Sequence, residues 1–283
     1  MKISSTAMEK ITKYPSTNSN NSSIDRRALL IFTGMTLVSF PFLSLAATTS
    51  SRVFTGKNDS SEQIDLKKGS AKQAKKKRIG VIGAGWLGGT VGKLLVKAGY
   101  EVMLSSRHPD ELKPMAESLG KLASVGTPKE AAAFGEVLLF AVPYDAIPQL
   151  GIDLKEQLKS KIVIDACNGG SGALGKEVEA NGAGPTTAKY LSGTRLVRGF
   201  SSEDATSIEA SATRTDRKLA IPIASNDKEA LEIASQLVKD VGCDPVIVGD
   251  LSSALKFQRS TSAFRVNTTA PELRRILGLK GGK

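Results

Sequence analysis

The chain has 283 residues, a formal net charge of +11, two cysteines and one histidine. Residues 1–77 hold 13 Lys or Arg and five Asp or Glu, which leaves 26 and 23 for residues 78–283. The charge is therefore mostly a property of the N-terminal part, and with no basic pattern interleaved with aromatic residues it excludes nucleic-acid binding. One histidine and two cysteines are too few soft ligands for a zinc site, so we expect no metal.

Residues 1–46 have the pattern of a twin-arginine export signal. A polar leader rich in Ser, Thr and Asn precedes Arg26-Arg27, a moderately apolar stretch follows, and Ser44-Leu45-Ala46 resembles a small-residue cleavage site. This pattern predicts export to the periplasm. A retained membrane anchor and an organellar transit peptide are the alternatives, because the stretch is about long enough to span a bilayer and the leader is poor in acidic residues.

Residues 47–77 are predicted to be a disordered basic linker. They are rich in Ser, Thr, Gly and Asn and end in Lys75-Lys76-Lys77. No hydrophobic pattern is present that could offset the entropy of ordering this segment. We expect membrane contact only through this linker or an uncleaved signal.

A glycine-rich turn begins the folded part. Residues 78–88 read RIGVIGAGWLG, a short apolar run that enters Gly83-x-Gly85-x-x-Gly88. In a dinucleotide-binding turn the first glycine makes the sharp bend, the second admits the pyrophosphate, and the third lets the helix pack on the strand. Free N–H groups and the dipole at the helix start favour the phosphate charge. The pattern predicts a dinucleotide site that includes Gly83, Ala84, Gly85, Trp86, Leu87 and Gly88.

The end of the second predicted strand selects the dinucleotide. An enzyme that uses NAD usually carries an acidic residue there for the ribose 2′-hydroxyl. This chain has Ser105-Ser106-Arg107 instead. Two hydroxyls and a guanidinium favour a 2′-phosphate, whereas a carboxylate would repel it. We therefore expect NADP (NADPH) rather than NAD, although Arg107 as an ordinary surface residue is the alternative.

Short apolar runs alternate with helical patterns from residue 78 onward. Predicted strands span 78–82, 101–105, 122–125, 136–142, 161–165, 195–199, 218–224 and 245–248, and predicted helices include 87–98, 109–119, 128–134 and 227–241. This alternation predicts an α/β, Rossmann-like doubly wound, mostly parallel sheet in a single domain over 78–257, with extra C-terminal strands and helices. Residues 251–259 and 271–277 are expected to form closing helices, and 258–283 a C-terminal helical tail.

The two cysteines are expected to be free thiols. Cys167 follows a strand and should lie at the carboxyl edge of the sheet, whereas Cys243 precedes a strand and should lie at the opposite edge. A disulfide requires Cα atoms within about 7 Å. No base is in evidence for Cys167, which argues against a nucleophilic role.

Several motifs of the chain resemble the coenzyme F420-dependent NADP oxidoreductase family. The same nucleotide-binding module begins pyrroline-5-carboxylate reductases and the NADP domains of membrane ferric reductases. The resemblance covers roughly residues 78–257. It rests on the glycine turn, Ser106-Arg107, Ala141-Val142-Pro143, Asp165-Ala166-Cys167-Asn168, Val197-Arg198-Gly199-Phe200 and Gly249-Asp250-Leu251 with Ala254.

The resemblance implies roles for the loops after the strands. Ser106-Arg107 would hold the 2′-phosphate, and Ala141, Val142 and Pro143 would pass beside the bound dinucleotide. Asn168 would lie near the nicotinamide and orient its carboxamide; Asp165 would do the same or serve as a turn-former. The catalytic residues stay unassigned, because catalysis in this family is mainly positioning of the cofactor and acceptor.

The function predicted from these motifs is an exported NADP(H)-dependent oxidoreductase. Its acceptor would be a flavin-like or deazaflavin-like co-substrate, or a small carbonyl or imine. A non-catalytic NADP-binding module that assists a partner is the alternative, since Gly169 and Ser201 stand where the family often has Pro and Asn. Homodimerisation is left open. Tyr144 is expected to pack on the surface, and Glu203-Asp204 to form a solvated turn.

Overall fold

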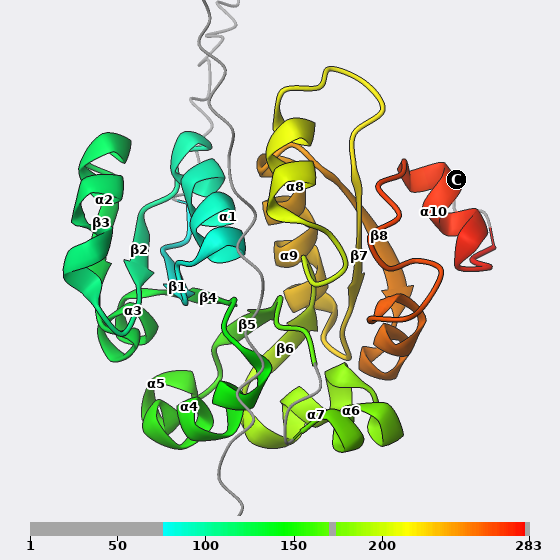
Figure 1. Ribbon diagram of the computed structural model, residues 1–283, viewed down its shortest axis with the longest axis horizontal. Coiled ribbons are helices and arrows are strands. Elements are labelled where there is room, and N and C mark those ends of the chain that lie inside the picture. The colour runs from blue at the N-terminus through cyan, green and yellow to red at the C-terminus, as the bar shows by residue number, and fades with distance from the viewer. Residues whose placement is uncertain (1–75, 170–173, 281–283) are drawn as a thin grey trace, which may run out of the picture. The chain divides into compact units, whose positions relative to one another are not determined.

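The computed structural model describes residues 76–169 and 174–280 (Figure 1). The predicted signal at 1–46 and almost all of the predicted linker at 47–77 lie outside these residues. Within the described ranges, no helix combines the length and hydrophobicity needed to cross a membrane.

The core of the fold is one eight-stranded sheet with the order β3-β2-β1-β4-β5-β6-β7-β8. All eight predicted strands are present, which confirms the α/β prediction. Their bounds are β1 Ile79–Ile82, β2 Val102–Ser105, β3 Ala123–Gly126, β4 Val137–Phe140, β5 Ile162–Asp165, β6 Arg195–Arg198, β7 Ala220–Ala224 and β8 Asp244–Gly249.

The helices alternate with the strands along the chain. They are α1 Trp86–Lys97, α2 Lys113–Leu119, α3 Pro128–Phe134, α4 Ile147–Asp153, α5 Lys155–Leu158, α6 Gly175–Asn181, α7 Ala183–Tyr190, α8 Ala205–Ala212, α9 Lys228–Asp240 and α10 Ala270–Ile276, with 3-10 turns η1 Pro109–Leu112, η2 Tyr144–Ala146 and η3 Leu251–Phe257. The four predicted helices are confirmed, with η1 and α2 together filling 109–119. Asp227 caps α9 by accepting a hydrogen bond from the Ala230 N–H.

Two helical layers cover the sheet (Figure 1). Alternate residues of each strand point to opposite faces, so Val81 packs in the cluster that includes Leu94 of α1 and Leu237 of α9. Ile82 packs on the other side with residues of α4 and α7, among them Ile147. A third apolar cluster joins β7 and β8 to η3 and α10.

The sheet departs from a parallel arrangement at β7. Strands β1 to β6 are parallel, β7 runs antiparallel to β6, and β8 is parallel to β7. The first six strands have the order 3-2-1-4-5-6, which has its switch point between β1 and β4. Ligands of such sheets bind at the carboxyl ends of the strands beside that point, so the fold marks where to look for a site.

The reversal at β7 corrects the expected position of Cys243. Because β8 runs opposite to β5, Cys243 lies on the side of the carboxyl ends of β1 to β6, the same side as Cys167 and not the opposite one. Strands β6 and β7 still separate β5 from β8, so the strands β5 and β8 lie about 14 Å apart. Both thiols are free and buried.

Candidate functional site

The glycine turn has the geometry that its sequence predicts. Gly83 has φ +94°, and a Cβ there would lie 2.6 Å from the carbonyl oxygen of Ala141. A Cβ at Gly88 would lie 2.2 Å from the carbonyl oxygen of Gly83, so only glycine lets α1 start this close to the turn. A Cβ at Gly85 would have no neighbouring atom within 4 Å. The turn therefore leaves open space beside the start of α1.

That open space belongs to a cavity of about 940 Å³ at the switch point of the sheet. The lining residues come from the carboxyl ends of β1, β2, β3 and β4 and from η1, η2 and α4. Eight of the predicted cofactor-binding residues line it: Gly83, Ala84, Gly85, Ser106, Arg107, Ala141, Val142 and Pro143. Residues far apart in the sequence thus meet at one place.

The predicted phosphate-binding group is only partly available to a ligand. Ser106 is half-buried and Arg107 is exposed, and both line the cavity. Ser105 is fully buried, and its hydroxyl donates a 2.6 Å hydrogen bond to the carbonyl oxygen of Val81. Its carbonyl oxygen accepts from the N–H of Ala84 at 2.7 Å. Ser105 therefore fastens the glycine turn to β2, and its side chain does not line the cavity.

Three other predicted cofactor contacts do not line the cavity. Trp86 is 65% exposed at the start of α1, and Leu87 packs against the apolar core. Gly88 is buried under the turn. All three belong to the first turn of α1, where Leu87 faces the core and Trp86 faces solvent.

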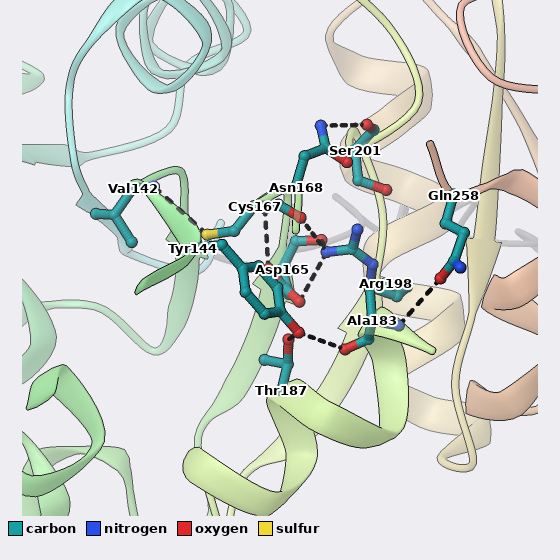
Figure 2. A network of polar contacts seen from close by, with 10 residues as sticks. All are labelled: Val142, Tyr144, Asp165, Cys167, Asn168, Ala183, Thr187, Arg198, Ser201 and Gln258. Atoms are coloured by element: carbon teal, nitrogen blue, oxygen red, sulfur yellow. Dashed lines mark hydrogen bonds and ion pairs between the residues drawn. The ribbon is translucent and has the colours of Figure 1, made fainter. Parts of the chain in front are cut away.

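Asn168 lies at a second cavity, of about 330 Å³. Its Nδ2 donates a 2.7 Å hydrogen bond to the carbonyl oxygen of Ser201 (Figure 2). The segment after β5 also contacts the lining of the first cavity, because the Val142 N–H there donates to Cys167 Sγ at 3.4 Å. Asn168 therefore lies beside this second cavity and not the first, and its contact with the dinucleotide stays a prediction.

Asp165 and Arg198 form a buried ion pair at the ends of β5 and β6. Arg198 Nη1 lies 2.7 Å from Asp165 Oδ2, and both side chains are at most 1% exposed. Nη1 also donates to the carbonyl oxygens of Asp165 and Cys167, at 3.2 and 2.6 Å. Asp165 Oδ1 accepts from the Cys167 N–H. Asp165 thus acts as a turn-former and partner of Arg198, which is the alternative role given to it above.

Two side chains near the site, Tyr144 and Glu203, differ from expectation. Tyr144 is buried rather than on the surface, and its hydroxyl donates to the carbonyl oxygen of Ala183 at 2.9 Å. Burial raises its pKa to about 12. Glu203 is 7% exposed, not solvated, and burial raises its pKa to about 7. Burial likewise raises the pKa of the Cys167 thiol well above its usual value, which removes it as a nucleophile.

Further residues of the first cavity were not predicted from the sequence. Thr127 and Lys129, which follow β3, line it with Glu111 and Gln149. Thr127 also caps α3 in a capping box with Glu130. A hydroxyl and a basic residue directly after a parallel strand were the available signal, because that position reaches the carboxyl edge of the sheet.

The sequence matches known proteins over the same region. Residues 78–169 match the family model described as NADP oxidoreductase, coenzyme F420-dependent. This segment is therefore similar to that family. The F420-dependent NADP reductase of Methanothermobacter marburgensis is 29% identical over 184 residues, which cover 59% of this chain and 81% of the reductase. The human metalloreductase STEAP2 is 26% identical over 191 residues, 66% of this chain.

The chain spans about a third of the length of the metalloreductase, since the match covers 36% of that protein. The structure also resembles the hypothetical protein SMa0349 from Sinorhizobium meliloti, with a TM-score of 0.62 and 21% identity over 69% of this chain and 96% of that one. At this identity the likeness establishes the Rossmann-like fold.

Proposed function

We propose that the chain is an NADP(H)-dependent oxidoreductase. The observation that carries the proposal is the meeting of the glycine turn, Ser106-Arg107 and Ala141–Pro143 around one cavity at the switch point. The family match over the same residues supports it. Its acceptor would be a flavin-like or deazaflavin-like co-substrate, or a small carbonyl or imine.

The residues present fit a dinucleotide. The space beside Gly85, which any side chain would narrow, suits a pyrophosphate at the N-terminus of the 12-residue α1. No acidic residue occupies the first turn of that helix, so nothing there opposes the negative charge. Arg107 and the Ser106 hydroxyl suit a 2′-phosphate, and the exposed Lys129 adds a second cation in the same cavity.

The chain's own contribution is positioning. When bound, NADPH supplies a hydride. The rigid turns after β1, β4 and β5 hold their backbones in place through hydrogen bonds to neighbouring strands, among them Ala141 N–H to Ile82 and Ala166 N–H to Phe140. Such fixed loops orient the cofactor and exclude alternative poses, which is the effect of proximity and orientation.

A turnover assay tests this proposal. The purified full chain is mixed with NADPH and with flavins, deazaflavins, quinones, and small carbonyls and imines in turn, and oxidation is followed at 340 nm. Steady oxidation with one acceptor class is expected. Tight NADPH binding with no oxidation by any acceptor would favour the non-catalytic NADP-binding module instead. Absence of NADPH binding would remove both.

We also propose that the chain is exported in folded form with its dinucleotide bound. The support is the twin-arginine pattern of residues 26–46. That route carries folded proteins, and an exported enzyme would find no NADP pool outside. Replacing Arg26-Arg27 by Lys-Lys should block export in a host with this pathway; unchanged export would contradict the proposal.

A further inference from the structure

Buried polar atoms without partners gather at one place in the described part of the chain. Six buried side-chain atoms of the described residues lack a hydrogen-bond partner. One of them, Asp165 Oδ2, is held in the ion pair with Arg198 Nη1, and four others belong to β6 and the turn after it: Arg198 Nε, Arg198 Nη2, Ser201 Oγ and Ser202 Oγ. A native fold leaves few such groups, because each has lost its hydrogen bonds to water without gaining a partner. Among them, the two Arg198 atoms belong to a residue that lines a cavity, which points to a ligand.

The guanidinium of Arg198 makes contacts through Nη1 only, and its edge formed by Nε and Nη2 is vacant. Nη1 makes the ion pair with Asp165 and the hydrogen bonds to the carbonyl oxygens of Asp165 and Cys167 (Figure 2). Nε and Nη2 have no partner among the described residues. These two N–H groups form the planar fork that matches the two oxygens of a carboxylate.

Another arginine of the same strand shows that this edge of a guanidinium can bind a carboxylate. At the other end of β6, Arg195 uses Nε and Nη2 to hold Asp227, with Nε 2.6 Å from Oδ2 and Nη2 2.9 Å from Oδ1. Arg195 is thus a template for Arg198 within one strand. The vacant edge of Arg198 can accept the carboxylate of a ligand in the same way.

The vacant edge belongs to the second cavity. Arg198 lines this space of about 330 Å³ together with Asn168, Gln258, Arg259 and the exposed Glu179. Gln258 Oε1 accepts a 3.1 Å hydrogen bond from the Ala183 N–H, which leaves its amide nitrogen as a donor. Arg259 adds a second positive charge that offsets Glu179 at the rim, while Asp165 faces Nη1.

The backbone beside this cavity is strained. Phe200, two residues after Arg198, has φ 59° although its side chain is large and buried. A non-glycine residue in this conformation is strained, and such residues cluster at functional sites. The strain holds the turn that carries Ser201, whose hydroxyl is one of the unpartnered groups.

We propose that the second cavity binds the carboxylate of the hydride acceptor through Nε and Nη2 of Arg198. The inference rests on the proposed function: Asn168 of the second cavity directly follows Cys167, which accepts the hydrogen bond from Val142 of the first cavity. It narrows the acceptor to a small molecule that carries a carboxylate next to its carbonyl or imine. A guanidinium edge also binds two oxygens of a phosphate, so inorganic phosphate is the competing anion in the test.

Binding of pyruvate to the full chain tests the proposal. Pyruvate and its amide, pyruvamide, share the carbonyl and differ in charge, and each is titrated by calorimetry with and without saturating NADP⁺, which prevents turnover. We expect pyruvate to bind at least about tenfold more tightly than pyruvamide or inorganic phosphate. Equal affinity for pyruvate and pyruvamide, or tighter binding of phosphate, would overturn the proposal.

Two variants locate the site. Arg198→Lys keeps the charge but loses the planar edge, and should weaken pyruvate binding at least about tenfold. Gln258→Glu keeps the acceptor for the Ala183 N–H and places a carboxylate in the cavity, so it should also weaken pyruvate binding. This variant provides the test if Arg198→Lys does not fold. Arg195→Lys, the matched change at the other end of β6, should bind pyruvate normally. Unchanged binding in both site variants would overturn the assignment.

The titrations separate this inference from the proposed function. Loss of NADP⁺ binding with pyruvate binding intact would contradict the oxidoreductase and spare the carboxylate site. Normal NADP⁺ binding without preference for pyruvate would contradict the carboxylate site and leave the oxidoreductase standing.

Discussion

Asp165 and Arg198 are register partners at the last positions of β5 and β6, and their side chains form an ion pair with almost no exposure to solvent. The pair ties together the two turns that border the second cavity. A buried charge left without its partner is costly, commonly 3–5 kcal/mol. The pair therefore makes the local structure depend on both residues.

Asp165→Asn should lower the free energy of unfolding by about 3–5 kcal/mol, because it leaves the Arg198 charge buried without a counter-charge. Urea denaturation monitored by circular dichroism measures the change. Asp227→Asn is the matched control: it removes the partner of Arg195, whose pair is about 30% exposed, and retains helix capping. That variant should cost about 1 kcal/mol or less. Equal losses in both variants would contradict the burial argument.

Gly85→Ala and Gly88→Ala should have opposite effects. A methyl group at Gly85 meets no atom within 4 Å, so stability should hold while NADPH binding weakens by at least about tenfold. A methyl group at Gly88 would contact the Gly83 carbonyl oxygen, so the melting temperature should fall by several degrees. Thermal unfolding and NADPH titration test both. A stable Gly85→Ala variant that binds NADPH normally would place the pyrophosphate elsewhere.

The strands were predictable because each is a short apolar run bounded by turn residues. The first cavity followed from the glycine turn and Ser106-Arg107, because their chemistry is local in sequence. The direction of β7 was not predictable: nothing in residues 199–219 specifies whether the chain crosses over or turns back. The position of Cys243 was wrong for the same reason.

The Asp165–Arg198 pair needed the register of the sheet. An arginine in a strand suggests an exposed residue, and nothing local indicates that its partner lies 33 residues earlier. A signal was nevertheless present, since opposite charges end two predicted neighbouring parallel strands. Ser105 was misassigned because a hydroxyl at a strand end can face either a ligand or the adjacent backbone, and only the packing decides.

Arg107→Ala should weaken NADPH binding far more than NADH binding. A hydrogen bond to a charged group contributes about 1.5–3 kcal/mol, which corresponds to roughly tenfold or more in affinity for the phosphorylated dinucleotide. Fluorescence titration with each dinucleotide measures the two affinities. Lys129→Ala serves as the comparison within the same cavity. Equal losses for NADPH and NADH in Arg107→Ala would refute the 2′-phosphate assignment.

Glu203 should make stability fall as the pH rises. Burial raises its pKa to about 7 in the folded chain, above the usual value of 4.5. The folded state therefore holds the proton more tightly, so its contribution is complete below about pH 4.5 and is lost as the pH rises through 7. Glu203→Gln should remove this dependence and gain up to about 3 kcal/mol relative to the parent chain at pH 8. Urea denaturation from pH 5 to 8 tests it; parallel curves for the two proteins would refute it.

Calorimetric titration of the purified full chain with NADPH and with NADH tests the central claim most directly. The account predicts one binding site, with NADPH bound at least about tenfold more tightly than NADH because of Arg107 and Ser106. No detectable binding of NADPH, or equal affinity for both dinucleotides, would contradict it.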